Sequence, residues 1–364
     1  MLTEQGMISS KQLSLIMLSL IEASTFTAVF VSQYTKQDTW VVLISGFIIV
    51  LFLLFMYVSL CSKFPGKTII EIHAKIYGNL LGNLISLLYI FYFWFIIPAN
   101  FRFLADFFST YLSQNSDIIP FIIPAAILCI YAVRKGAEVI SRVSSILSIL
   151  TVMLSIIITA LIAKDIHISN LLPPLQLNLG QFVQGTNIMV AIPLGEIIVF
   201  MIFFPHLNDQ TKLRKSAFTG LILSFIFFLF VLVRNTLVLG NVSSLQVQPA
   251  YQVSSLINVG EVITRVEVTT AVFLLFNLLM KICFFLYATV ISIAQCFKLR
   301  SYKPLVFPVT AISAVLSITM FKSPLDQLYI ASDIYPIYAL LFIVILPITS
   351  FILASIKKSS KTAS

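Results

Sequence analysis

The chain has 364 residues, of which 59% are hydrophobic and only 10% are charged. Soluble globular domains are about 25% charged, so this composition excludes a water-soluble enzyme. Because a bilayer-spanning helix needs about 20 consecutive apolar residues, the apolar content is enough for roughly ten spans and leaves little for a domain outside the membrane.

The apolar segments are continuous and are separated by charged or turn-rich breaks. Residues 46–60, for example, lack the apolar–polar alternation that a transmembrane barrel requires. Helices satisfy their own backbone hydrogen bonds inside a bilayer. The sequence therefore predicts an all-α integral membrane protein, a single membrane domain over residues 1–364, with ten transmembrane helices at residues 11–34, 40–61, 82–112, 118–133, 143–163, 183–205, 216–239, 268–296, 304–321 and 333–356.

Lysine and arginine are distributed unequally between the two sides of this predicted bundle. Sixteen lie on the side that holds both termini, five lie on the other side, and Arg102 and Lys281 fall inside spans. By the positive-inside rule both termini face the cytoplasm, which requires an even number of spans. The net charge of +9 then reflects topology and attraction to anionic membrane lipid. No basic stripe with interleaved aromatic residues is present, so we expect no binding of nucleic acid.

The pattern of spans repeats after the fifth. Spans six to ten begin about 180 residues after spans one to five, and in each half the longest connection follows the second span. Since five is odd, the second half (residues 183–356) is inserted upside down relative to the first (residues 11–163). Such a five-plus-five inverted repeat places a small-molecule site near the midplane, where broken helices meet.

The first span of each half is predicted to be the broken one. Residues 193–196 of span six bring a proline, a glycine and a carboxylate together in mid-membrane, whereas residues 22–25 of span one have a carboxylate and two hydroxyl groups but no Gly or Pro. Half-helix ends attract a carboxylate at exposed amides and an ammonium at exposed carbonyls, so a zwitterionic amino acid suits both. The alternative is that Pro193 only kinks its span and that Ser24 and Thr25 bond back to their own helix.

An aromatic segment of span three, residues 92–98, would make an apolar wall for the side chain of a ligand. Ile96 and its immediate neighbours are the part of this segment that we expect to face the site. The predicted substrate-binding residues are Glu22, Ala23, Ser24, Thr25, Ile96, Pro193, Leu194, Gly195 and Glu196.

Three charges, Glu22, Glu196 and Lys281, lie near the middle of their spans, where each costs about 2.5 to 3.5 kcal/mol. Each should therefore face the bundle interior and find a partner. We expect Lys281 on span eight to pair with Glu22 on span one, as an ion or proton switch that locks the bundle. The alternative is a static buried salt bridge. Arg102 and Asp106, four residues apart near the outer end of span three, should form an ordinary ion pair.

No motif indicates catalysis. The histidines His73, His167 and His206 are far apart, the four cysteines follow no metal-ligand spacing, and no phosphate-binding glycine loop is present. We therefore expect no enzyme activity, no cofactor and no bound metal.

Four segments, taken together and in order, carry a resemblance to a known family. They are residues 136–142 (GAEVISR), residues 170–175 (NLLPPL), residues 195–205 from Gly-Glu to Phe-Pro, and residues 260–267 (GEVITRVE). The chain resembles the spore germination permease family, the B subunits of nutrient germinant receptors in endospore-forming bacteria. That family is similar to the amino acid, polyamine and organocation transporter superfamily, with its leucine-transporter-like fold. Members commonly have a glycine-containing break in span one, from which residues 22–25 depart.

The resemblance implies a multi-pass protein of the spore's inner membrane that binds a small germinant, often an amino acid, and triggers germination with an A subunit and a lipoprotein C subunit. The alternative function is a proton-coupled amino-acid transporter that uses the same pocket, with Lys281 or Glu22 titrating as it cycles. Because Glu22 would alter the charge preference of the pocket, the nutrient itself stays open.

Overall fold

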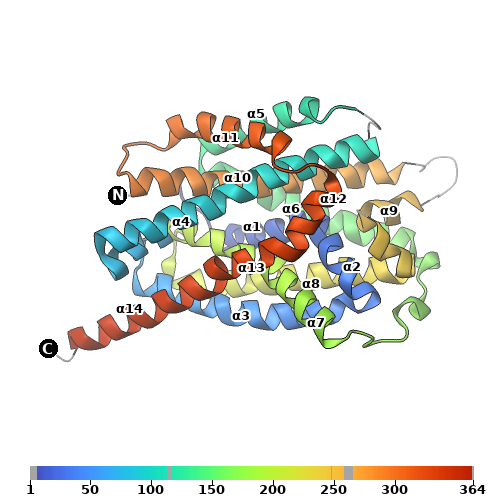
Figure 1. Cartoon of the computed structure of the whole chain (residues 1–364), viewed down its shortest axis with the longest axis horizontal. Helices are drawn as coiled ribbons and strands as arrows, with labels where there is room; N and C mark the ends of the chain where they lie inside the picture. Colours follow the sequence, from blue (N-terminus) through green and yellow to red (C-terminus); the bar gives the residue numbers. More distant parts are fainter. Residues whose placement is uncertain (1–5, 113–115, 247, 258–264, 363–364) are drawn as a thin grey trace.

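The computed structural model describes residues 6–112, 116–246, 248–257 and 265–362. Its helices pack into one bundle, with the two ends of the described chain at the same end of it (Figure 1). The α-helices are α1 (Ser10–Ala23), α2 (Val29–Thr35), α3 (Thr39–Lys63), α4 (Ile69–Phe107), α5 (Ile119–Lys135), α6 (Ala137–Leu161), α7 (Leu179–Met189), α8 (Leu213–Leu239), α9 (Pro249–Ser255), α10 (Val266–Cys296), α11 (Lys303–Thr319), α12 (Pro324–Tyr329), α13 (Tyr335–Leu340) and α14 (Leu346–Thr362).

Ten rods of helix occupy the ten predicted spans of the described chain. Seven helical stretches among the described residues are long and apolar enough to cross a membrane. The other three rods fall short of that length because α1 has 14 residues and α5 and α11 have 17 each. The first rod continues through α2 after a break, and the last consists of α12, α13 and α14 with π-helical turns between them.

The third rod begins earlier than predicted. α4 starts at Ile69 because Thr68 and Glu71 form a reciprocal capping box, in which each side chain accepts the other residue's backbone N–H. Gly78 then takes a left-handed φ of 81°, which kinks the helix before the membrane span. The long connection after the second rod is therefore partly helical, as is its counterpart after the seventh rod, which contains α9.

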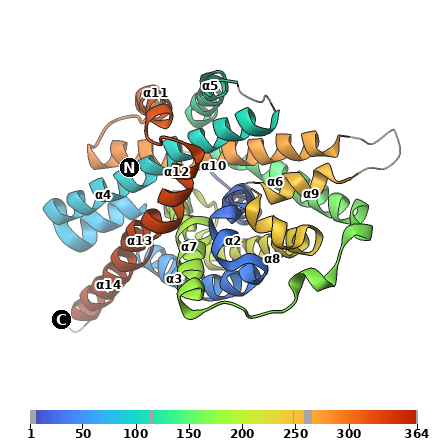
Figure 2. The same ribbon diagram turned by 45° about the vertical axis from the view of Figure 1, so that its right-hand side comes forward.

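The two rods predicted to be broken lie inside the bundle. α1 packs against α6, α8 and α10, and α10 also packs against α4. Every residue from 188 to 207 on the sixth rod is buried. By contrast, α5 and α11 lie side by side at the edge of the bundle (Figure 2). The interrupted rods are thus held on all sides by other helices.

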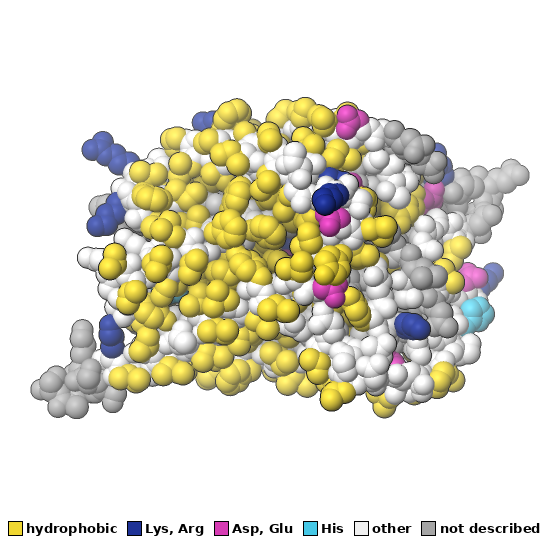
Figure 3. Space-filling model, in the orientation of Figure 1, with side chains coloured by type: hydrophobic (Ala, Val, Ile, Leu, Met, Phe, Trp, Pro, Cys, Tyr) yellow, Lys and Arg dark blue, Asp and Glu magenta, His cyan; other side chains and the backbone are white. Residues whose placement is uncertain are grey.

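The surface of the bundle is largely apolar. Large side chains such as Phe52, Ile127 and Leu80 are 61%, 60% and 85% exposed. Hydrophobic side chains cover most of the middle of one face, and Lys and Arg lie mostly toward its ends (Figure 3). An apolar surface of this extent marks contact with a membrane. The chain is accordingly a multi-pass membrane protein.

Candidate functional site

The first rod changes its helical pitch at the predicted position. α1 ends at Ala23, residues Ser24–Ala28 form a 3₁₀ helix, and α2 resumes at Val29. Hydroxyl groups stabilise this change, because Thr25 Oγ1 donates to the Glu22 carbonyl and Thr27 Oγ1 to the Ser24 carbonyl, both at 2.7 Å. The rod is interrupted, but the chain stays helical and does not unwind into an extended segment.

The sixth rod is interrupted twice. α7 passes into a π-helical turn, Val190–Leu194, and then into a 3₁₀ helix, Gly195–Ile202. Pro193 has no N–H to donate and therefore breaks the α-helical ladder. A Cβ at Gly195 would overlap the Val190 carbonyl oxygen and would lie 2.9 Å from the Ile343 side chain. Only a glycine allows the π turn and the last rod to come this close.

Lys281 of α10 connects the two interruptions. Its Nζ lies 2.5 Å from Glu196 Oε2 and donates a hydrogen bond to Ser24 Oγ at 3.2 Å. The side chains of Lys281 and Glu196 are only 1% and 3% exposed. The structure thus brings a cation and an anion of the second half of the chain together, and the same lysine reaches Ser24 of the first half.

The predicted pairing of Lys281 with Glu22 is wrong. Glu22 precedes Ser24 by two residues, about 200° around a helix, so the two side chains point to nearly opposite sides of the rod. Neither carboxylate oxygen of Glu22 has a hydrogen-bond partner within the described chain, and its polar neighbour is Ser148 of α6. The error arose because the length and composition of a span do not specify its rotation about the helix axis.

A cavity of about 60 Å³ adjoins the ion pair. Glu196 and Lys281 supply its charged side, and aromatic rings, among them Phe30 and Phe95, line its apolar side. By the same measure one water molecule needs roughly 10 to 15 Å³, so the cavity suits a few waters or one of the smallest amino acids.

Four polar side chains complete the lining: Thr27, Asn100, Gln327 and Tyr335. Asn100 donates to the Ile96 carbonyl at 2.7 Å, and Gln327 donates to the Ala99 carbonyl at 2.8 Å. Tyr335 lines the cavity from α13. Asn100 bonds back to its own helix, whereas Gln327 belongs to α12 and therefore ties the last rod to the α4 wall of the cavity.

The structure places the predicted site residues in three groups. Ile96, Glu196 and Lys281 line the cavity. Ser24 does not line the cavity, but its hydroxyl accepts a hydrogen bond from Lys281, which does. The lining does not include Glu22, Ala23, Thr25, Pro193, Leu194 or Gly195.

Sequence reasoning missed the polar lining. Asn100 follows Ile96 by four residues and therefore shares its helix face, which is a signal that could have identified it. Gln327 and Tyr335 belong to the last rod, and no local pattern distinguishes them there. Their position depends on how that rod packs across α4.

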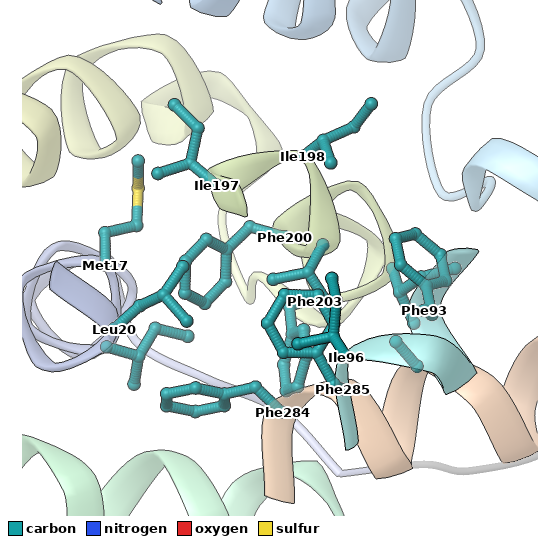
Figure 4. Close-up of a cluster of buried hydrophobic side chains, with 14 of the residues drawn as sticks. Met17, Leu20, Phe93, Ile96, Ile197, Ile198, Phe200, Phe203, Phe284 and Phe285 are labelled. Atoms are coloured by element: carbon teal, nitrogen blue, oxygen red, sulfur yellow. The ribbon is translucent and has the colours of Figure 1, made fainter. Parts of the chain in front are cut away.

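An aromatic cluster lies between Glu196 and the end of the bundle where the termini lie, and its rings do not belong to the cavity lining. The Phe284 ring contacts those of Phe200 and Phe203 at centroid distances of 5.6 and 5.7 Å. Figure 4 shows these rings between α1, α10 and the 3₁₀ helix Gly195–Ile202, with Leu20 and Phe285 beside them. Phe200, Phe203, Phe284 and Phe285 are all buried in the main hydrophobic core.

Toward the opposite end, a second cavity of about 170 Å³ adjoins the first. Phe30, Phe103 and Gln327 line both. The rings of Phe30 and Phe103 meet edge to face, with centroids 5.7 Å apart. A solute entering from this end would therefore pass the Phe30–Phe103 contact before it reached Lys281.

The predicted ion pair on α4 is confirmed. Arg102 Nε lies 2.9 Å from both carboxylate oxygens of Asp106. Arg102 Nη1 also donates to the Phe321 carbonyl at 3.1 Å. The pair therefore ties α4 to the chain that follows α11.

Comparison with known proteins links the chain to spore germination. The spore permease family model, described as "Spore germination protein", matches residues 7–324. The chain is 27% identical to spore germination protein KB of Bacillus subtilis (strain 168), over 99% of this chain and 98% of that protein. It is 24% identical to the putative spore germination protein YfkT of the same organism, over 89% of each chain.

Solved transporters share the fold. Mhp1, a nucleobase-cation-symport-1 family transporter in a closed conformation with bromovinylhydantoin bound, matches with a TM-score of 0.64 and 16% identity, over 90% of this chain and 75% of that one. The substrate-bound, outward-open state of a Na⁺-coupled sialic acid symporter matches with a TM-score of 0.69 and 11% identity, over 96% and 89%. The predicted leucine-transporter-like fold is confirmed, and the matched fold is that of membrane transporters.

Proposed function

Because the chain belongs to the spore germination protein family, we propose that it is the B subunit of a spore nutrient germinant receptor. Its ligand would be a small nutrient, with an amino acid as the first candidate. The observation that carries this proposal is the buried Glu196–Lys281 pair, which lies on the wall of a cavity between the two interrupted rods.

A zwitterionic amino acid carries both charges that Glu196 and Lys281 now supply to each other. Its ammonium group would bind Glu196 and its carboxylate would bind Lys281, while Ile96 and the neighbouring rings would contact its side chain. One buried ion pair is then exchanged for two, so no charge is left without a partner.

This exchange would also change the contact between rods. In the described structure Lys281 holds α10 against both Glu196 and Ser24. A ligand inserted between the two charges would separate α10 from the interrupted rods and favour a different arrangement of the bundle. That difference in arrangement would be the signal passed to the rest of the receptor.

Location and assembly complete the proposal. We place the protein in the spore's inner membrane with both termini in the cytoplasm, as the sixteen-to-five distribution of Lys and Arg favours. The cavity at the Phe30–Phe103 contact would then open outward. Residues 11–163 and 183–356 would be the two inverted repeats. The partners would be the A and C subunits and membrane lipid.

Filling the cavity tests the site. We expect spores whose only receptor locus carries Ile96→Trp to lose their response to one compound in a panel of nutrients, at normal protein level. The matched control is Leu88→Trp, which adds the same ring on the same helix at a position that is 40% exposed. A normal response from Ile96→Trp spores would contradict the proposed site.

The second candidate function is a proton-coupled amino-acid transporter. It is supported by the fold shared with solved symporters and by Glu22, a buried carboxylate with no hydrogen-bond partner among the described residues. Uptake of radiolabelled amino acid into proteoliposomes, accelerated by an imposed proton gradient and abolished by Glu22→Gln, would favour the transporter. Germination without such uptake would favour the receptor.

A further inference from the structure

Arg234 is a buried cation on α8 for which the described chain provides no counter-charge. The residue is 4% exposed. Its Nε and Nη2 donate to Asn235 Oδ1 at 3.2 and 2.9 Å, but Nη1 has no hydrogen-bond partner among the residues that the structure describes. Two other buried cations, Arg102 and Lys281, each have a carboxylate partner.

A buried arginine cannot remove its own charge by losing a proton. A buried lysine or carboxyl group can become neutral, whereas the guanidinium group keeps its proton under all ordinary conditions. A buried charge without a partner is strongly unfavourable in a membrane-embedded bundle. Something other than a described side chain must therefore compensate Arg234.

A cavity of about 30 Å³ lies against the guanidinium group. It is bounded by α6, α8, α9, α10 and the 3₁₀ helix of the first rod, and its described lining contains no acidic side chain. The hydroxyl groups of Thr25, Thr151, Ser155 and Thr270 line it together with Arg234. Thr25, Thr151 and Thr270 donate to carbonyls of their own rods, and Thr151 also accepts from Asn277 Nδ2 at 2.8 Å. A hydroxyl that donates to a ligand here would exchange such a backbone acceptor for it.

We propose that this cavity binds a small monovalent anion of the halide class, with chloride as the natural occupant, and that the anion neutralises Arg234. The charge of the site selects an anion, and its volume excludes phosphate or a second amino acid. The site is separate from the cavity beside Lys281, since the two cavities share no lining residue. The proposal does not depend on which nutrient the protein binds.

Thermal unfolding of the purified full-length protein tests the site. Sodium chloride or bromide replaces sodium gluconate at constant ionic strength, so that only the anion changes. A bound halide stabilises the folded state by mass action, and we expect the melting temperature to rise by several degrees and then saturate. Arg234→Gln should abolish this rise. Arg265→Gln, which removes an arginine whose side chain is 78% exposed at the start of α10, should keep it.

Two results would overturn the proposal: a wild-type melting temperature that does not depend on halide, or a halide effect that persists in Arg234→Gln. If Arg234→Gln does not fold, Thr151→Val provides the second test, because loss of one hydroxyl should shift the halide titration to higher concentration. Crystals soaked in bromide give an independent readout. Anomalous density beside Arg234 Nη1 would support the site, and its absence at saturating bromide would refute it.

Discussion

Removing the partners of the central ion pair one at a time should leave a charge stranded inside the bundle. In Lys281→Met, Glu196 remains buried without its cation, and its least costly response is to take up a proton. Protonating an ordinary glutamate side chain at pH 7 costs about 3.7 kcal/mol, and deprotonating an ordinary lysine, as Glu196→Gln would require, costs about 4.6 kcal/mol. Each single variant should therefore lose about 4 kcal/mol of stability.

The double variant should recover most of this loss. Lys281→Met combined with Glu196→Gln removes both charges. The remaining loss of stability comes from burying the new amide at position 196 without its hydrogen bonds, which costs about 1–3 kcal/mol. The two substitutions should thus be strongly non-additive, as expected for residues in direct contact.

The stability of each single variant should depend on pH, with opposite signs for the two. In Lys281→Met the folded state binds one more proton than the unfolded state at pH 7, so stability should rise by about 1.4 kcal/mol for each pH unit below 7. In Glu196→Gln the folded state binds one proton fewer, so stability should rise as pH increases above 7. Denaturant unfolding in detergent from pH 5 to 9 measures both slopes.

The exposed pair Glu138–Arg142 provides the control. Its N···O distance is 2.8 Å, but the side chains are 43% and 66% exposed. Glu138→Gln should change stability by less than about 1 kcal/mol, with no opposed pH slopes. If the two central substitutions are additive, or if both single variants show flat pH profiles, the reasoning that these charges depend on each other is refuted.

Two further predictions concern the interrupted rods. Gly195→Ala should lower stability by about 3 kcal/mol, the upper part of the range for overpacking, because the overlapping atom at Val190 is backbone. Gly180→Ala, where the Cβ would meet only the Asn178 side chain, should change it by less than about 1 kcal/mol; equal melting temperatures of the two variants would contradict the steric argument. Glu22→Gln should leave membrane abundance and melting temperature nearly unchanged, because the carboxylate makes no described hydrogen bond to lose. A large loss would reveal a partner for Glu22.

The positions of the membrane rods follow from local composition. A run of apolar residues can satisfy its backbone in lipid only as a helix, so ten such runs predict ten rods, although the third and the last rods begin earlier than predicted, at Ile69 and Pro324. The breaks are local as well, since Pro193 lacks a donor and the hydroxyls near Ser24 compete for backbone carbonyls. These features require no knowledge of how the rods pack.

The identity of charge partners and cavity walls could not be obtained in this way. Whether Lys281 meets Glu22 or Glu196 depends on the rotation of three rods about their axes, which is set by side-chain packing between segments far apart in the chain. The same holds for Gln327 and Tyr335, which reach the cavity from the last rod. A charge in mid-membrane demands a partner for energetic reasons that the sequence already shows, but which partner it finds is a property of the packed bundle.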